Sequence, residues 1–302
     1  MEKKTRVGFI GVGLMGHGAA KHILETGGYP LTILGHRNRE PVEDLVRRGA
    51  SEAKDPAEVA AASDVVILCV PSSVEVEATF AGPRGLMGAV RPGMIFIDTT
   101  TADPAVTRKL GAELAERGAH LIDAALGRTP KEAEAGKLAT YVGGDPAIIA
   151  KVRPILETYT DTIILCGPLG AGTTCKLVNN SITMGMTAVF SEGVATAAKL
   201  GVDLSALCQV LAAGGAGGRM WDMLRPWVES GDDSGLRGPI RIGAKDIRTF
   251  TRMAENAGMA TFVAQAVNQM LRTALNQGHG ERFLPVMPGI VAEWNGTKVR
   301  DL

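Results

Sequence analysis

A lysine and two asparagines stand close together in residues 172–180 (GTTCKLVNN). Lys176 lies three residues before Asn179 and four before Asn180, so in a helix the three side chains share one face. Apolar neighbours and the positive end of a helix dipole would both lower the pKa of Lys176 toward neutrality. Such an ammonium can donate a proton to a carbonyl oxygen that an adjacent amide orients. The spacing leaves one alternative open, a surface lysine beside two amides at a helix start.

A second constellation near the N-terminus has the form of a phosphate-binding loop. The sequence VGFIGVGLMG places Gly11, Gly13 and Gly16 between an expected strand and a helix expected to start near Leu14. In a dinucleotide-binding fold the first glycine makes a tight turn, the second admits the pyrophosphate, and the third lets helix and strand pack closely. Free N–H groups at the helix start, of Leu14 and Met15, would face the phosphates. The strand–turn–helix context favours this interpretation over a chance cluster of glycines.

The residues after the second expected strand favour NADP over NAD. An acidic residue at this place would bind the ribose 2′-hydroxyl of NAD, but the strand is followed by GHRNR at residues 35–39. Arg37 and Arg39 can pair with a 2′-phosphate, since a guanidinium matches phosphate oxygens. We therefore expect His36, Arg37 and Asn38 at this end of the cofactor, with NADP preferred and NAD as the alternative. Two solvated surface arginines would be the other explanation.

The ends of the next two expected strands supply further candidate cofactor contacts. Carboxyl ends of parallel strands line the ligand crevice of such a sheet. We therefore expect Val70 and Pro71 beside the adenosine, and Thr100 beside the nicotinamide ribose. The alternatives are a proline that merely ends a strand and hydroxyls that cap the helix expected near Asp103.

An alternating α/β domain must position these candidates. Short apolar runs separated by helix-like stretches predict parallel strands near residues 6–10, 31–34, 65–70, 94–97 and 120–122, with 139–142 and 162–165 as extensions of the same sheet. After residue 167 the periodicity is helical throughout, at residues 173–200, 204–213, 220–229, 245–257 and 261–277. The sequence thus predicts a Rossmann-type doubly wound sheet in a dinucleotide-binding domain of residues 1–167, followed by an all-helical domain of residues 168–302.

Composition narrows the classes of partner. The 302 residues hold 32 Lys plus Arg and 32 Asp plus Glu, so no net field favours nucleic acid or an anionic membrane. The four cysteines form no CxxC or Cys/His spacing, which fits free thiols in a reducing, cytoplasmic setting without a bound metal. No signal segment or apolar run of about 18 residues is visible. The five histidines form no triad, and His17 is expected to be an ordinary helix residue.

Several segments, in this order along the chain, resemble the β-hydroxyacid dehydrogenase family, which includes 3-hydroxyisobutyrate dehydrogenases and tartronate semialdehyde reductases. They are residues 11–16, 98–101, 123–144 and 170–180, and the pair Lys245-Asp246 is similar to the family's Lys-Asp pair near the nicotinamide. The resemblance covers essentially the whole chain. It implies a Rossmann domain, a helical dimerising domain and an active site between them.

The same resemblance implies roles for individual residues. Lys176 would be the acid/base, Asn180 together with Asn179 would orient the substrate, and Lys245 would approach the cofactor or the substrate. It further implies a homodimer or homotetramer assembled through the C-terminal helical domain.

One segment departs from the family pattern. Members usually carry Ser-Gly-Gly after a strand beginning Asp-Ala-Pro-Val, where a hydroxyl and amides hold the substrate carboxylate, but this chain has Gly127, Arg128 and Thr129. Arg128 places a permanent fork of donors where the acid group of a small substrate should sit. The triplet is similar to that of sulfolactaldehyde reductases, which interconvert 3-sulfolactaldehyde and 2,3-dihydroxypropanesulfonate. The alternatives are a carboxylate substrate, or an Arg128 that pairs with Glu132 or Glu134 in its own loop.

These observations favour an NAD(P)-dependent oxidoreductase that interconverts a small acidic β-hydroxy compound and its semialdehyde. Trp221, in a segment that resembles the family's substrate pocket, is expected at the substrate, with helix packing as the alternative. Two other functions are an imine reductase on the same scaffold and a non-catalytic NADP-binding module. Both kinds of relative generally lack the lysine, so the presence of Lys176 argues against them.

Overall fold

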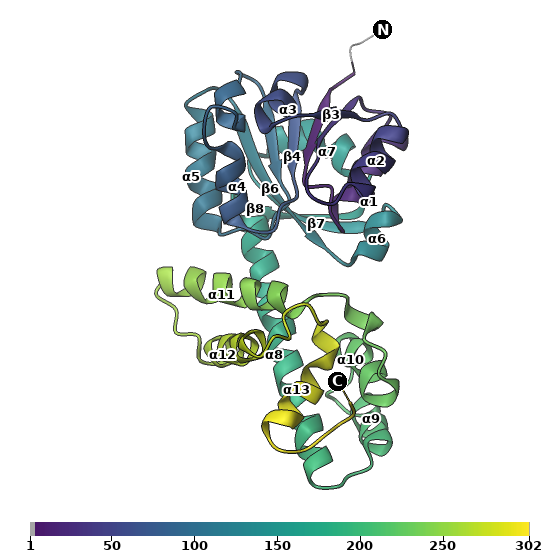
Figure 1. The fold of residues 1–302 in the computed structure, drawn as a ribbon. Coiled ribbons are helices and arrows are strands. Elements are labelled where there is room, and N and C mark those ends of the chain that lie inside the picture. Colours follow the sequence, from purple (N-terminus) through teal and green to yellow (C-terminus); the bar gives the residue numbers. More distant parts are fainter. Residues whose placement is uncertain (1–3, 302) are drawn as a thin grey trace. The chain divides into compact units, whose positions relative to one another are not determined.

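The computed structural model describes residues 4–301, and the chain divides into two compact units, Met1–Lys176 and Leu177–Leu302. The division falls nine residues after the domain boundary expected at residue 167. It lies inside the long helix α8 (Ala171–Lys199) because the first turn of that helix is bonded to the sheet of the first unit. Figure 1 shows the elements of each unit.

The first unit is built on one eight-stranded sheet with the order β3-β2-β1-β4-β5-β6-β7-β8. Neighbouring strands are parallel except for the antiparallel pair β6 and β7. The strands are β1 (Val7–Ile10), β2 (Leu31–Leu34), β3 (Ser51–Ala53), β4 (Val65–Leu68), β5 (Ile95–Asp98), β6 (His120–Gly127), β7 (Leu138–Gly143) and β8 (Thr160–Gly167). The predicted doubly wound α/β fold is confirmed. Strand β3 was not expected, since it has three residues and two of them are exposed.

Helices cover both faces of this sheet (Figure 1). One face packs against α1 (Gly16–Glu25), α2 (Glu40–Arg47) and α7 (Pro146–Leu156). The other packs against α3 (Pro56–Ala62), α4 (Ser73–Phe80), the 3-10 turn η1 (Leu86–Ala89) and α5 (Pro104–Ala115). In β4, Val65 and Ile67 enter the first core while Val66 and Leu68 enter the second. Burial on both faces explains why the central strands are continuously apolar.

The second unit is helical, as predicted. It contains most of α8 and the elements α9 (Leu204–Ala213), α10 (Arg219–Ser230), η2 (Ser234–Leu236), α11 (Ile240–Asn256), α12 (Phe262–Asn276), η3 (Leu284–Val286) and α13 (Met287–Trp294). Its core joins side chains from all five of the longer helices and from α13, with Trp221 and Leu224 fully buried. Helix α13 was not expected, because its eight residues are too few for a clear helical period and include a proline and a glycine.

Two kinds of feature are absent from residues 4–301. No helix there combines the length and apolar character needed to cross a bilayer. No group of three or more His, Cys, Asp or Glu side chains in this range is arranged to hold a metal ion.

A buried carboxylate fixes the start of α8 to the sheet. Asp123, in β6, is fully buried, and its two oxygens accept hydrogen bonds from the main-chain nitrogens of Gly170 (2.6 Å) and Thr173 (2.7 Å). Burial raises the pKa of Asp123, and the two main-chain donors limit that rise. The carboxylate therefore determines where the first turns of α8, including Lys176, lie on the sheet.

We expect Asp123→Asn to destabilise the protein by about 1–3 kcal/mol, because the amide NH₂ would face one of the two N–H donors and leave it unpaired. The free energy of unfolding from urea titration measures this. Asp145→Asn is the matched control. Asp145 caps α7 at an exposed position through Ala147 N (2.7 Å), where asparagine caps equally well, so the change should stay within about 0.5 kcal/mol. Equal effects of the two substitutions would contradict the anchoring role of Asp123.

Candidate active site

The turn between β1 and α1 has the geometry of a pyrophosphate-binding loop. Gly11 has φ +102°, and a Cβ there would collide with the carbonyl oxygen of Cys69. A Cβ on Gly16 would collide with the carbonyl oxygen of Gly11, whereas a Cβ on Gly13 would meet no heavy atom within 4 Å. Helix α1 starts at Gly16, two residues later than expected, and Leu14 is exposed. The loop therefore fits a dinucleotide, because its backbone is tightly packed on the protein side and open at Gly13.

The two arginines after β2 differ in their partners. Arg39 donates to both carboxylate oxygens of Glu52 in β3, at 2.7 and 2.8 Å, so it is engaged within the protein and does not offer its fork to a 2′-phosphate. His36 and Arg37 are exposed, and Arg37 makes no ion pair within residues 4–301. The Asn38 side chain accepts a hydrogen bond from Glu40 N (3.2 Å). Of the two arginines, Arg37 is the one without an ion-pair partner among residues 4–301.

The ends of β4 and β5 are bonded to each other. The main-chain nitrogen of Val70 donates to the hydroxyl of Thr100 (3.3 Å), and Thr100 is buried. The alternative that the hydroxyl side chains after β5 cap the next helix is wrong. The N-cap of α5 is Asp103, whose carboxylate accepts a hydrogen bond from Ala105 N (2.9 Å). At the carboxyl end of β4, Val70 is half-buried and Pro71 is exposed. The Thr100 hydroxyl thus holds two strand ends in register, and any bond to a cofactor would use its remaining hydrogen.

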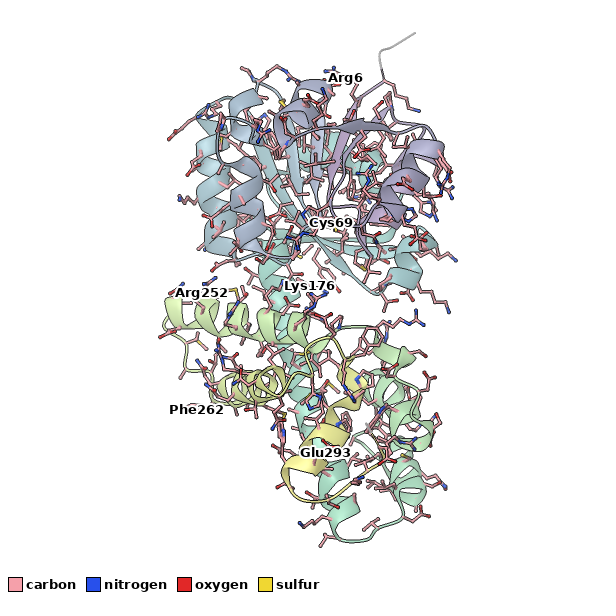
Figure 2. The ribbon with its side chains drawn as sticks, viewed as in Figure 1. Arg6, Cys69, Lys176, Arg252, Phe262 and Glu293 are labelled. Atoms are coloured by element: carbon pink, nitrogen blue, oxygen red, sulfur yellow. The ribbon has the colours of Figure 1, made fainter. Side chains whose placement is uncertain are left out.

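Lys176 lies in the second turn of α8 (Figure 2), and a polar cluster follows it along the helix. Asn180 donates through Nδ2 to Oδ2 of Asp246 in α11 (2.7 Å), while its Oδ1 accepts from Asn179 Nδ2 (3.2 Å). Lys245 Nζ lies 2.8 Å from the other Asp246 oxygen. Asp246 is buried, so its carboxylate holds the amide of Asn180 and the ammonium of Lys245 together. We had not expected a site role for Asp246, although the Lys-Asp pair in the sequence was the available signal.

The loop that departs from the family pattern is held by the far edge of the sheet. Arg128 has φ +73° and is the one non-glycine residue with a positive φ within residues 4–301. Its guanidinium donates to Asp161 (2.7 Å) and Thr162 (3.0 Å) in β8 and to the carbonyl oxygen of Lys137. The Arg128 hydrogen bond holds the pKa of the Asp161 carboxyl below its usual range. The anion that Arg128 meets in this conformation is therefore Asp161.

The alternative pairing of Arg128 with Glu132 or Glu134 is wrong, because both glutamates have other partners. Glu132 accepts from the main-chain nitrogen (3.0 Å) and the hydroxyl of Thr129, and this capping box starts the short helix α6 (Pro130–Glu134). Glu134 bonds to His17 and Lys21 of α1. The triplet 127–129 is therefore fixed by two neighbours, α6 after it and β8 beside it.

Trp221 does not lie at an accessible surface. Its side chain is fully buried in the core of the second unit, and its ring packs on Phe190 with centroids 5.0 Å apart. The expectation that it contacts substrate is not met in this conformation, because buried aromatic area packs the helices instead. The sequence could not separate these roles, since both place a tryptophan on the apolar face of α10.

Comparison with known proteins decides the family. Residues 6–167 match the model for the NAD binding domain of 6-phosphogluconate dehydrogenase, and residues 170–283 match the model for the NAD-binding part of NADP-dependent 3-hydroxyisobutyrate dehydrogenase. The chain belongs to the 3-hydroxyisobutyrate dehydrogenase-like β-hydroxyacid dehydrogenases. It is an NAD(P)-dependent hydroxyacid dehydrogenase, with a nicotinamide cofactor and the predicted α/β and helical parts.

Individual relatives span most of the chain. Mitochondrial 3-hydroxyisobutyrate dehydrogenase of Rattus norvegicus is 31% identical over 93% of this chain and 85% of its own. NAD-dependent L-serine dehydrogenase of Pseudomonas aeruginosa is 29% identical over 93% of this chain and 96% of its own. Among solved structures, 3-hydroxyisobutyrate dehydrogenase of Mycobacterium tuberculosis with L-serine superimposes with a TM-score of 0.85 at 22% identity, covering 96% of this chain and 99% of that one.

The glycine loop of this dehydrogenase generates a paired prediction. Gly13→Ala should leave the unfolding midpoint unchanged, because the added methyl group meets open space. The same substitution should raise the KM for the nicotinamide cofactor by about tenfold, because the methyl group lies where a pyrophosphate must approach. Gly11→Ala should instead destabilise the fold by about 1–3 kcal/mol or more. The backbone of residue 11 has a positive φ, and the added Cβ would collide with the carbonyl oxygen of Cys69. Thermal unfolding and cofactor titration separate the two, and a normal cofactor KM in stable Gly13→Ala would refute the loop assignment.

Proposed function

We propose that the enzyme oxidises a small β-hydroxy acid to its semialdehyde, and runs the reverse reduction, with Lys176 as the acid/base. The position of Lys176 supports this, because it is fixed one turn after the amides that Asp123 holds. The glycine loop at Gly11, Gly13 and Gly16 would hold a nicotinamide cofactor, which would supply a hydride acceptor for the carbon that bears the hydroxyl. Lys176 takes the hydroxyl proton during oxidation and returns it to the carbonyl oxygen during reduction.

Asn180 orients the reacting oxygen in this proposal. Its amide assignment follows from Asp246, whose ionised carboxylate only accepts hydrogen bonds and so requires the Nδ2 side. One Nδ2 hydrogen is used by Asp246, and the second is left to donate to the substrate. Asn179 buttresses this amide from the Oδ1 side, and Lys245, held by the same carboxylate, approaches the cofactor.

The triplet 127–129 binds the acid group of the substrate, with Arg128 as the charged donor. Both Nη1 hydrogens and one Nη2 hydrogen of Arg128 are used by Lys137, Asp161 and Thr162. Its Nε–H and second Nη2 hydrogen make no hydrogen bond within residues 4–301, so one edge of the fork stays available for an anion. The relatives include L-serine and 3-hydroxyisobutyrate dehydrogenases, which favours a carboxylate substrate. A sulfonate, as in sulfolactaldehyde, is the second candidate and rests on the Gly-Arg-Thr triplet alone.

NADP is the preferred cofactor in this proposal, and Arg37 recognises its 2′-phosphate with His36 and Asn38 beside it. Arg37→Ala should lower kcat/KM for NADPH by about tenfold and leave that for NADH unchanged. Arg39→Ala is the control, since Arg39 is paired with Glu52. A wild-type enzyme that prefers NADH, with no effect of Arg37→Ala, would overturn the proposal.

A second copy of the chain covers the exposed face of α8. Val178, Ile182, Met186 and Val189 form an apolar stripe along this helix, and Val263 of α12 lies next to Gly185 in its middle. The adjacent Phe262 is 86% exposed (Figure 2). An apolar surface of this kind is typical of subunit contacts, and we propose a homodimer, or a tetramer of such dimers, through the helical unit. Light scattering gives the mass in solution, and a monomer would contradict this assembly.

Lys176→Ala should reduce kcat by roughly 10²–10⁴-fold with unchanged cofactor affinity, because it removes the proton donor and acceptor. Lys199→Ala, at the other end of α8 where the amine bonds to Asn295 O (2.6 Å), is the matched control and should keep full activity. The assay uses 3-hydroxyisobutyrate, L-serine, 2,3-dihydroxypropanesulfonate and a cyclic imine with both cofactors. Turnover of the imine that survives Lys176→Ala would favour the imine reductase, and no turnover at all would favour a binding module.

Arg128→Ala should raise KM for every acidic substrate by about tenfold or more, the loss expected for a charge-assisted hydrogen bond. Arg153→Ala serves as the control, because Arg153 pairs along α7 with Glu157 (2.7 Å). The ratio of the effects on sulfonate and carboxylate substrates identifies the acid group. An unchanged KM for all of them would remove Arg128 from the substrate site.

A further inference from the structure

His17 connects three helices of the first unit. It lies at the start of α1, directly after the glycine loop, and its two ring nitrogens face two different carboxylates. Nδ1 is 2.7 Å from Glu134 Oε1 in α6, and Nε2 is 3.0 Å from Asp44 Oδ2 in α2. Helix α6 begins directly after the triplet 127–129. One side chain thus joins the helix of the phosphate loop to the helix that follows the substrate loop.

The hydrogen bonds of His17 require a particular protonation state. An ionised carboxylate only accepts hydrogen bonds, and a neutral imidazole has a single N–H to donate. Two bonds to two carboxylates therefore need the imidazolium. His22, one turn further along α1, differs in this respect. Its Nε2 faces the carbonyl oxygen of Glu134 (3.0 Å) and its Nδ1 faces the hydroxyl of Thr26 (3.1 Å), which can donate, so the neutral ring satisfies both.

The charged groups around His17 keep both carboxylates ionised. Asp44 also accepts from Arg48 (2.6 Å) and Arg47 (3.3 Å), and the Arg48 hydrogen bond, followed by that of His17, holds the pKa of Asp44 well below its usual range. Burial raises the pKa of Glu134, yet the hydrogen bonds from His17 and Lys21 bring it below its usual value. Arg48 further pairs with Glu25 at 2.6 Å.

Loss of the second ring proton of His17 would remove one of its two hydrogen bonds to the carboxylates. The hydrogen bonds that arginine and lysine side chains make to the same carboxylates would remain. Each carboxylate would still have an arginine or lysine partner, but a ring nitrogen lone pair would then face one of them, which is repulsive. Because Gly18 packs directly on the backbone of Ala133 in α6, a small displacement there carries α6 and the triplet before it. The expected consequence is a change in substrate binding and not global unfolding.

We propose that His17 is a positioning residue whose protonated ring holds α6, and with it the substrate triplet 127–129, against the cofactor-binding helix. Binding of the acidic substrate therefore weakens as pH rises and His17 loses its proton. This inference rests on the proposed function of the triplet. It goes beyond that function by placing a pH-dependent control on substrate affinity in a side chain whose ring nitrogens face the carboxylates of Glu134 and Asp44.

The protonation state of His17 is measured first, by a method that needs no activity assay. Nitrogen NMR of the full chain labelled at histidine should show His17 protonated at both ring nitrogens near neutral pH and His22 at one, with assignments from His17→Gln and His22→Gln. Glu134→Gln should move the His17 titration to lower pH, because the imidazolium loses one of its two anions. A singly protonated His17 at neutral pH, or a titration unmoved by Glu134→Gln, would overturn the inference.

The effect on binding is measured as KM for 3-hydroxyisobutyrate between about pH 6 and pH 9, where its carboxylate does not titrate. KM should rise about fivefold with pH in the wild type and in His22→Gln, and should be high at all pH values in His17→Gln. The KM for the cofactor should change less than about twofold. If His17 had a purely structural role, His17→Gln would lower the unfolding midpoint and leave the pH profile of the substrate KM intact. If His17→Gln fails to fold, Glu134→Gln carries the test, since its KM profile should shift to lower pH.

The outcomes separate this inference from the proposed function. If Lys176→Ala abolishes turnover but the KM profile is the same in His17→Gln, the inference fails and the function stands. If no acidic substrate is turned over, the proposed function fails. The inference is then decided by amide hydrogen exchange in residues 127–136, whose protection should fall with pH in the wild type relative to His17→Gln.

Discussion

The placement of the catalytic helix depends on one buried carboxylate. Both oxygens of Asp123 accept hydrogen bonds from main-chain nitrogens at the start of α8, one from Gly170 just before the helix and one from Thr173 in its first turn. A buried carboxylate is costly unless its hydrogen bonds are complete, so the sheet and the helix start tolerate only one relative position. Lys176 inherits its location from this constraint, since it follows Thr173 by one turn.

The helical unit uses the same principle. Asp246 is buried and holds Asn180 with one oxygen and Lys245 with the other. The buried acid thus restrains the flexible side chains of Asn180 and Lys245. Polar groups at a reacting centre need to be preorganised in this way. In both units the buried acid acts through the groups that it holds.

The substrate loop illustrates how topology changes the meaning of a residue. The local sequence around Arg128 predicts either an anion fork or a pairing with a glutamate in its own loop. Because β7 runs antiparallel to β6 and β8 runs parallel to β7, the start of β8 returns to the end of β6. This brings Asp161 and Thr162 to the guanidinium across more than thirty residues of chain. No local pattern encodes that pairing, and the same holds for the bridge from Asp44 through His17 to Glu134.

The local sequence is enough to predict the fold class, the glycine loop, the helical second half and the position of Lys176 on a helix face. These features follow from periodicity, chain-local sterics and spacing within one element, which a sequence carries directly. The tertiary structure alone decided that Arg39 is taken up by Glu52, that Trp221 is core, that Asp246 organises the amide and ammonium groups, and that His17 bridges two acids. Each of these depends on which distant side chain comes within about 3 Å, and that distance is set by strand order and helix packing.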